Sequence, residues 1–399
     1  MPIFTALLAA ATLVHSGGLS QTVGEAAGID VPFRIGENAI IVDAKVNGRN
    51  VSLMFDTGFG GSVDVDESID LGPATGKMTL RDFVGEMQAS TVKLTNLNLG
   101  AKKINIQGLS EAVVSPPSNY SLAYNTHCDG LMGFEVIQNN VTEINYEKKK
   151  FVFYPSSVDI SKRIPDNKRT FLAKLLPIGQ NSLMISVDSP SGKKMALALD
   201  TGNAFYATTH KDVLERVGLW DAGRIAKYMS ESGVASGTVD SWTYKMSSAN
   251  VFTVPVKDSY WDVIDLPSSS AEGDGTVGYG FLSNFNITID FARRRVWLEN
   301  FTGKAANEME GETGITAGYN RQIKKTEIIR VGPNTPGEDA GIKEDDLLLG
   351  VGNVDTVGMG YRRLRKLLRG PIGSKVTLVI SRNGSLKRVE VVRKALINE

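Results

Sequence analysis

The tripeptide Asp-Thr-Gly occurs twice in this chain of 399 residues, at 56–58 and again at 200–202. Each copy follows a short apolar run, and a glycine lies eight residues before each aspartate (Gly48 and Gly192). This pattern is typical of a hairpin turn that leads into a buried strand. A single Asp-Thr-Gly is weak evidence, because an aspartate often caps the turn after a strand. Two copies in the same context predict two strands that each present a carboxylate at their end.

The repeat continues downstream of both tripeptides. The stretch 129–154 resembles 276–298: each contains a Gly-Phe pair, then an alternating strand, a basic triplet at a turn and a final apolar strand. We pair Gly133 with Gly280, which lie 77 and 80 residues after the two aspartates. The chain therefore consists of two β-rich halves of similar plan.

The remaining segments complete a plan of domains. The start of the chain is apolar and then rich in small residues, which predicts a signal peptide and an exported protein, periplasmic or secreted. A change of character after residue 302 indicates a further domain. The predicted boundaries are 1–28 for the signal segment, 29–155 and 166–302 for the two halves, 156–165 and 303–311 for linkers, and 312–397 for the last domain.

Composition excludes several classes of function. The formal net charge is zero, which argues against a nucleic-acid partner. Cys128 is the one cysteine, so neither an internal disulfide nor a cysteine-rich zinc site is possible. No HExxH pair and no GxSxG elbow is present. We expect no metal, no organic cofactor and no stable membrane span, and we expect a monomer because both halves are in one chain.

Two strand ends that face each other would bring the two carboxylates together. Like charges at that distance cannot both ionise, so the pair would share one proton. One carboxylate could then act as general base on water, while the other acts as general acid toward a carbonyl. The threonines could hydrogen-bond into the facing loop, and the glycines allow a tight turn beside the carboxylates.

On these residues the chain resembles a bilobal aspartic peptidase of the pepsin and retropepsin superfamily, over residues 29–302. The matching segments are Asp56-Thr57-Gly58, Asp200-Thr201-Gly202 and the bracing element Leu131-Met132-Gly133, whose second copy falls at Val277-Gly278 or Tyr279-Gly280. The resemblance implies a mostly β fold with two pseudo-twofold-related, barrel-like lobes. It also implies catalytic Asp56 and Asp200, a peptide cleft between the lobes and a flap. The flap would be the hairpin at 77–94, with Phe83, Val84 and Gly85 at its tip.

Two positions depart from the family pattern, which has a small or hydroxyl residue after Asp-Thr-Gly. Phe59 and Asn203 occupy these positions here. Phe59 cannot hydrogen-bond the outer carboxylate oxygen, and the loss of such a bond favours protonation. The dyad itself is unaffected, but the sequence leaves the pH optimum of its activity open.

The C-terminal residues 312–397 resemble a PDZ domain of the bacterial envelope-protease type. They contain an AGIKEDD turn, a basic amphipathic helix at 361–370 and a hairpin around Asn383-Gly384. The resemblance implies capture of peptide C-termini by strand addition. We place the carboxylate loop at Ile315, Thr316, Ala317, Gly318 and Tyr319. The basic helix face either receives acidic groups or is simply solvated.

The sequence thus predicts an aspartic endopeptidase that acts on peptides or proteins, with a PDZ domain that recruits or positions substrate tails. A peptide-binding pseudoprotease, in which the PDZ domain carries the function, is the first alternative. In a second alternative the PDZ domain gates the cleft. A dimeric retropepsin is disfavoured, because both halves are already present.

Overall fold

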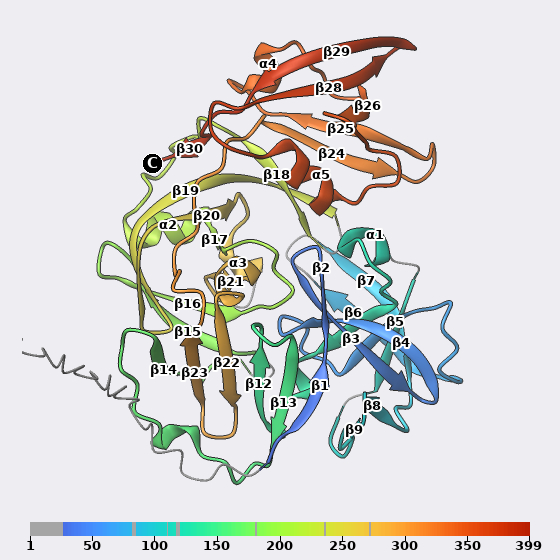
Figure 1. The fold of residues 1–399 in the computed structure, drawn as a ribbon, viewed down its shortest axis with the longest axis vertical. Coiled ribbons are helices and arrows are strands. Elements are labelled where there is room, and N and C mark those ends of the chain that lie inside the picture. Colours follow the sequence, from blue (N-terminus) through green and yellow to red (C-terminus); the bar gives the residue numbers. More distant parts are fainter. Residues whose placement is uncertain are drawn as a thin grey trace, which may run out of the picture.

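The fold was obtained as a computed structural model, and it is mostly β (Figure 1). The structure describes residues 27–81, 85–109, 111–116, 120–179, 182–234, 237–270 and 273–399. Its strands form four sheets, of which one is shared between the two halves of the repeat. No helix within these ranges combines the length and the apolar character that crossing a membrane would require.

The shared sheet contains two matching hairpins. Its order is β1-β13-β12-β22-β23-β14, and β12 pairs with β22 antiparallel across the middle. The two basic triplets form the hairpin turns, with Lys149 and Arg294 in the left-handed region at φ 51° and 52°. The strands are β1 (Ile29–Pro32), β12 (Val141–Asn145), β13 (Lys150–Tyr154), β14 (Thr170–Lys174), β22 (Phe285–Asp290) and β23 (Arg295–Asn300), and the 3-10 turn η2 (Ile160–Lys162) packs nearby.

The first half builds a sheet in the order β6-β7-β10-β5-β11-β4-β3-β8-β9, with β2 paired to β3. Asn47 and Gly48 both have positive φ, as a tight hairpin turn requires, and they join β3 to β4. The strands are β2 (Arg34–Gly36), β3 (Ala39–Val46), β4 (Arg49–Asp56), β5 (Val63–Asp66), β6 (Ala74–Arg81), β7 (Glu86–Val92), β8 (Leu97–Leu99), β9 (Lys102–Lys103), β10 (Ala112–Ser115) and β11 (Gly130–Gly133), with α1 (Tyr120–Tyr124) before β11 and η1 (Phe134–Val136) after it.

The second half builds a sheet in the order β15-β16-β21-β17-β20-β19-β18. An additional pairing of β15 with β19 closes part of this sheet on itself, so it is barrel-like. Its elements are β15 (Met184–Asp188), β16 (Lys194–Leu199), β17 (Ala207–His210), β18 (Ser230–Val234), β19 (Gly237–Val251), β20 (Val254–Ile264) and β21 (Gly275–Val277), with α2 (Lys211–Val217), α3 (Tyr279–Leu282) and η3 (Ser268–Ser270).

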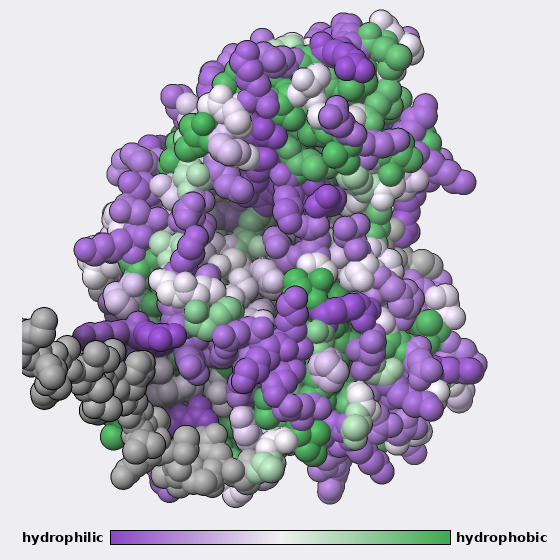
Figure 2. Space-filling model, viewed as in Figure 1, coloured by the Kyte–Doolittle hydropathy of each residue, from purple (hydrophilic) through white to green (hydrophobic). Residues whose placement is uncertain are grey.

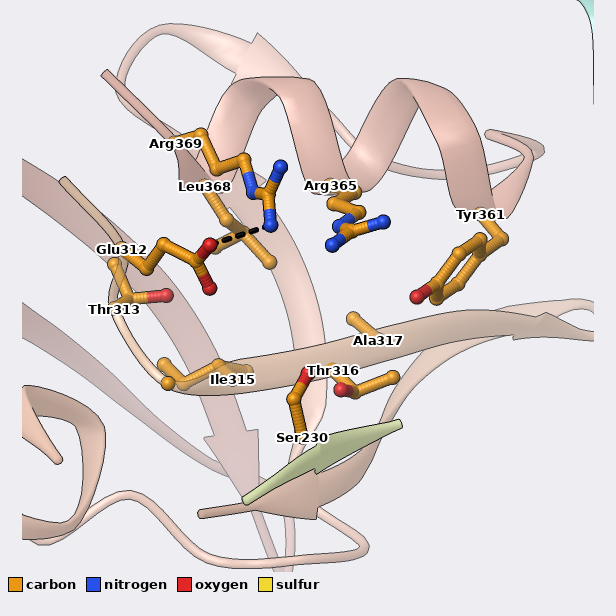
Figure 3. Close-up of a pocket in the computed structure, with 11 residues that line it drawn as sticks. Ser230, Glu312, Thr313, Ile315, Thr316, Ala317, Tyr361, Arg365, Leu368 and Arg369 are labelled. Atoms are coloured by element: carbon orange, nitrogen blue, oxygen red, sulfur yellow. Dashed lines mark hydrogen bonds and ion pairs between the residues drawn. The ribbon is translucent and has the colours of Figure 1, made fainter. Parts of the chain in front are cut away.

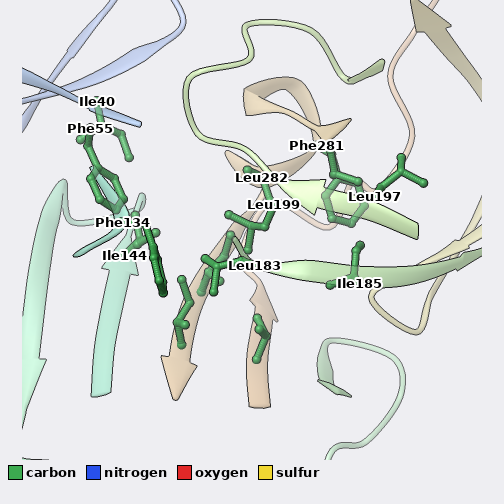
Figure 4. Packing of buried hydrophobic residues seen from close by; sticks show 14 of the residues in the cluster. Ile40, Phe55, Phe134, Ile144, Leu183, Ile185, Leu197, Leu199, Phe281 and Leu282 are labelled. Carbon is green, nitrogen blue, oxygen red and sulfur yellow. The ribbon is translucent and has the colours of Figure 1, made fainter. Parts of the chain in front are cut away.

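One continuous hydrophobic core runs through these three sheets. Figure 4 shows Ile40, Phe55 and Phe134 on one side of it, and Leu183, Leu199 and other side chains of the second half on the other. The two halves therefore share one core and do not form two separate domains. Burial of apolar surface holds the two Asp-Thr-Gly segments at fixed positions in one body.

The C-terminal part has a core of its own. Its sheet order is β24-β25-β26-β28-β29, with β27 paired to β26, and Leu348, Leu364 and Leu378 are fully buried within its core. Figure 2 shows hydrophobic side chains gathered over this part, whereas the rest of this face is mostly hydrophilic. The elements are β24 (Ile315–Asn320), β25 (Lys325–Val331), α4 (Pro336–Asp339), β26 (Leu347–Val351), β27 (Val354–Asp355), α5 (Tyr361–Leu368), β28 (Lys375–Arg382) and β29 (Ser385–Val392). The expected hairpin turn at Asn383-Gly384 is present, with φ of 51° and 80°.

The end of the chain returns to the second half. Strand β30 (Ile397–Asn398) pairs in parallel with β19, at Thr243 and Tyr244. The Asn398 side chain is buried, and its oxygen accepts the Lys227 amide at 2.6 Å. The C-terminal part is consequently attached to the second half at its end as well as through the chain that enters it.

Candidate active site

Both Asp-Thr-Gly segments lie where a central strand ends. Asp56 is the last residue of β4, and Asp200 directly follows β16. A second strand runs parallel to each: β11 beside β4, with Gly133 opposite Asp56, and β21 beside β16, with Val277 opposite Leu199. The parallel neighbour holds each carboxylate-bearing turn from one side.

A matching backbone bond braces each turn. The Phe134 amide donates to the Phe59 carbonyl at 2.9 Å, and the Tyr279 amide donates to the Asn203 carbonyl at 2.7 Å. Gly278 is therefore the counterpart of Gly133, which corrects the expected pairing of Gly133 with Gly280. Gly280 lies instead in α3, because the second half forms a helical turn directly after the brace. The two copies of the brace then fall 77 and 78 residues after their aspartates.

The two threonines exchange hydrogen bonds across the halves. The Thr57 hydroxyl accepts the Thr201 amide at 3.0 Å and donates to the Leu199 carbonyl at 2.7 Å. The Thr201 hydroxyl accepts the Thr57 amide at 3.0 Å and donates to the Phe55 carbonyl at 2.8 Å. Both side chains are buried. Four bonds thus join the two turns and leave neither threonine amide unsatisfied.

The two glycines lie directly against the carboxylates. The Gly58 amide donates to Asp56 Oδ1 at 2.8 Å, and the Gly202 amide donates to Asp200 Oδ1 at 2.9 Å. A Cβ atom built on Gly202 would lie 2.4 Å from Asp56 Oδ1, and one built on Gly58 would lie 3.0 Å from Asp200 Oδ1. Each carboxylate therefore touches the turn of the other half, and a larger residue than glycine does not fit at 202.

The two carboxyl groups perturb each other. Burial, followed by the negative charge of Asp56, raises the pKa of Asp200 above its ordinary value. Burial also raises the pKa of Asp56. The hydrogen bonds with the Gly58 amide and with Asp200, and the positive charge of Arg362, lower this pKa but do not outweigh burial. The pair therefore favours a form that carries one proton, as two acids in contact do.

The residues after the tripeptides turn away from the carboxylates. Asn203 donates its side-chain amide to the hydroxyls of Thr208 and Thr276, at 2.9 and 2.6 Å. The Phe59 ring packs against Gly61 and Gly133. The Asn203 amide donates to Asp200 Oδ1 at 3.0 Å, whereas the Phe59 amide donates to the backbone carbonyl of Asp56 at 3.2 Å.

The candidate flap is a hairpin of β6 and β7. Its register runs from Ala74 opposite Val92 to Arg81 opposite Glu86, and an ion pair of 2.8 Å joins Arg81 to Glu86 at the last described rung. Of the three expected tip residues, Phe83 and Val84 lie outside the described residues, and Gly85 directly precedes β7. The flap role remains a prediction.

A second candidate site lies between β24 and α5 in the C-terminal part. The segment Ile315–Tyr319, expected to be a carboxylate loop, is instead most of the edge strand β24, because it pairs with β25 over its whole length. Figure 3 shows α5 above this strand and Ser230 of β18 beside it. Two polar atoms of this pocket, Thr313 Oγ1 and Arg369 Nε, are buried and have no hydrogen-bond partner among the described residues.

Other reactive side chains are poor candidates. Burial raises the pKa of the Cys128 thiol to about 11, so it stays protonated near neutral pH. The neighbouring His127 pairs with Asp129 at 3.1 Å. Within the described ranges, no three His, Cys, Asp or Glu side chains lie close enough together to hold a metal ion.

Comparison with known proteins identifies the C-terminal part. Residues 327–382 match the family model of the PDZ domain, so the chain contains a PDZ domain there. A carboxyl-terminal-processing protease of Picosynechococcus sp. (strain ATCC 27264 / PCC 7002 / PR-6) is 28% identical over 93 residues. That match covers 23% of this chain and 22% of the relative, so the chain matches about a fifth of its relative's length.

Sequence reasoning missed one residue near the dyad. Arg362, the second residue of α5, donates to the carbonyl of Gly202 at 3.0 Å. Its only signal in the sequence was the density of positive charge at 361–370, which has a solvated face as its usual meaning.

Proposed function

We propose that the protein is an aspartic endopeptidase whose dyad is Asp56 and Asp200. The observation that carries this proposal is the reciprocal bonding of Thr57 and Thr201, which brings the two Asp-Thr-Gly turns face to face. Two carboxyl groups in contact that favour a singly protonated form are what acid–base hydrolysis of an amide needs. The two halves would then be pseudo-twofold-related lobes of a pepsin-like fold.

The chemistry follows from one shared proton. The ionised carboxylate takes a proton from a water molecule, and the water oxygen attacks the carbonyl carbon of the peptide. The protonated carboxyl gives its proton to the carbonyl oxygen, so a neutral tetrahedral diol forms. The carboxyl that took the proton from water then gives it to the nitrogen, while the other carboxylate takes a proton from a hydroxyl of the diol. The carbon–nitrogen bond breaks, a carboxylic acid and an amine leave, and the pair again carries one proton. Backbone amides of residues 58 and 202 hold the two carboxyl groups in place during these steps.

The C-terminal domain supports a function that involves peptides. PDZ domains bind peptides by adding a strand to a sheet edge, and β24 is such an edge here. A relative named as a processing protease is consistent with proteolysis as the activity of the whole chain. We propose that the PDZ domain receives peptide C-termini, and that the protein is exported and acts as a monomer.

A peptide-binding protein without turnover is the second candidate. The observation that favours it is that the family match falls on the PDZ domain rather than on the two halves that hold the dyad. In that case the Asp-Thr-Gly turns would serve only to join the halves.

Peptide-library cleavage by the purified chain, from about pH 3 to about pH 7.5, separates the two candidates. The matched sample is the Asp56→Asn variant, whose shape is nearly unchanged. Cleavage that disappears in the variant supports the peptidase. A folded sample that cleaves nothing at any pH, yet binds peptides, would favour the second candidate.

A further inference from the structure

Helix α5 of the PDZ domain lies between the two halves of the repeat rather than in solvent. Gly360, the residue that caps its N-terminus, touches the first half: a Cβ built there would lie 2.1 Å from the backbone oxygen of Leu122 in α1. The Tyr361 hydroxyl reaches the second half, where it donates to the Glu231 carbonyl of β18 at 2.7 Å. The start of the helix thus contacts both halves of the repeat.

Arg362 makes the contact nearest to the dyad. Its guanidinium donates to the carbonyls of Glu37 and Asn38 in the first half, at 3.2 and 3.1 Å. It also donates to the Gly202 carbonyl in the second half at 3.0 Å, and it lies over the Tyr124 ring. One side chain therefore donates to three backbone carbonyls that belong to both halves of the repeat.

Further charges hold the helix in this position. Lys366 and Arg363 both pair with the buried carboxylate of Glu37, at 3.1 and 3.8 Å. The Arg365 guanidinium lies 4.2 Å from the centroid of the Phe205 ring, three residues past the second Asp-Thr-Gly. The basic face, predicted to be solvated or to receive acidic ligands, instead contacts groups of the two halves, although Lys366 keeps two thirds of its side chain exposed.

We propose that α5 is an internal plug of the peptide cleft, which holds the enzyme in a self-inhibited form. An extended peptide that crosses the dyad must bond its amides to backbone acceptors on the walls, since amides left unpaired away from water are costly. The Gly202 carbonyl belongs to the residue whose backbone lies against the Asp56 carboxylate, and Arg362 already occupies it. Substrate would have to displace the guanidinium first. This inference rests on the proposed function.

The attachment of the PDZ domain explains why the plug stays in place. Before the domain, the Asn307 side chain exchanges two hydrogen bonds of 2.9 Å with the backbone of Tyr260. After the domain, β30 is paired to β19. With both ends of the domain tied to the second half, α5 remains at high local concentration over the cleft.

Three variants of the full chain test the plug. Arg362→Ala removes the three carbonyl bonds, and Gly360→Ala forces the helix away from α1. Arg388→Ala is the matched control, because it removes an exposed arginine from β29 in the same domain. We measure kcat/KM on peptides of about ten residues, and hydrogen exchange of the α5 amides.

The plug predicts that Arg362→Ala and Gly360→Ala raise kcat/KM at least tenfold, with faster exchange in α5, while Arg388→Ala changes neither. A fall in kcat/KM, or no change, would mean that α5 is a fixed wall of the cleft and would overturn the proposal. If no protein cleaves peptides, the proposed peptidase fails, and exchange alone decides whether Arg362 holds the helix. If hydrogen exchange of the α5 amides is unchanged in both variants, Arg362 does not hold the helix in place either.

Discussion

The hydroxyls of Thr57 and Thr201 each accept the backbone amide of the other residue at 3.0 Å. Each hydroxyl also donates to a strand carbonyl of the opposite half, at 2.7 and 2.8 Å. The arrangement joins two segments that are 144 residues apart in the sequence. It determines the distance between the two carboxylates, because each aspartate directly precedes its threonine.

The first prediction concerns this exchange. Thr57→Val keeps the shape but leaves the Thr201 amide and the Leu199 carbonyl without their partner. We expect the free energy of unfolding to fall by about 2–4 kcal/mol, since each buried unsatisfied group costs about 1–3 kcal/mol. Thr57→Ser keeps the hydroxyl and should lose much less. Denaturant titration of both variants measures the difference, and equal losses would show that the methyl group matters rather than the bonds.

The second prediction concerns pH and stability. The pKa of Asp200 is raised in the fold, so ionising it costs more in the folded protein than in the unfolded chain. That cost is absent below the unfolded pKa of about 3.9 and grows as the pH rises above it. Asp200→Asn should therefore raise Tm at pH 7 and leave it nearly unchanged near pH 3.5.

Asp166 provides a control of opposite sign. Backbone amides of Thr170, Lys168 and Arg169 lower the pKa of its carboxyl. Its contribution to stability is present above the unfolded pKa and is lost as the pH falls. Asp166→Asn should thus lower Tm at pH 7. A lower Tm for Asp200→Asn at pH 7 would contradict the raised pKa of the dyad.

The third prediction compares the two glycines. A Cβ at position 202 would lie 2.4 Å from Asp56 Oδ1, whereas one at position 58 would meet Asp200 only at 3.0 Å. Gly202→Ala should displace the Asp56 carboxylate and lower kcat by about a hundredfold, the cost of misplacing a reacting group by about 1 Å. Gly58→Ala should lower kcat less. Kinetics of the two variants on one peptide check the order, and the reverse order would refute the geometry.

The fourth prediction concerns the pocket of the PDZ domain. Thr313 Oγ1 is buried there without a partner among the described residues, so its hydroxyl could donate a hydrogen bond to a ligand carboxylate. We expect Thr313→Val to weaken binding of a peptide with a free C-terminus by about fivefold, roughly 1 kcal/mol. Binding of the same peptide with an amidated C-terminus should not change. Fluorescence anisotropy gives both affinities, and Thr377→Val on β28 is the control.

Local patterns in the sequence were sufficient for the strands that carry the candidate dyad. Gly48 and Gly192 mark the hairpin turns, and the apolar runs after them become β4 and β16, since short-range periodicity and turn chemistry decide such elements. The second brace was left open between Val277-Gly278 and Tyr279-Gly280, and the structure selects the first, so only the repeat pairing of Gly133 with Gly280 was wrong, by two residues. The chain forms α3 directly after Gly278, and a four-residue helix has too few positions to show a period.

The contacts of the C-terminal domain could not be predicted in the same way. Arg362 meets Gly202, which is 160 residues away, and β30 meets β19 across a similar separation. Such contacts depend on the complementarity of surfaces that are already folded. A basic helix gives no indication of which carbonyls its arginines will bind.

The kinetics of Asp56→Asn, Asp200→Asn and the double variant on one cleaved peptide test the central claim most directly. Residues that act as a unit are not additive, so each single change should remove nearly all the activity that the double change removes. Circular dichroism must show that all three variants are folded. Either single variant retaining a substantial part of the wild-type kcat would contradict the dyad, as would losses that simply multiply in the double variant.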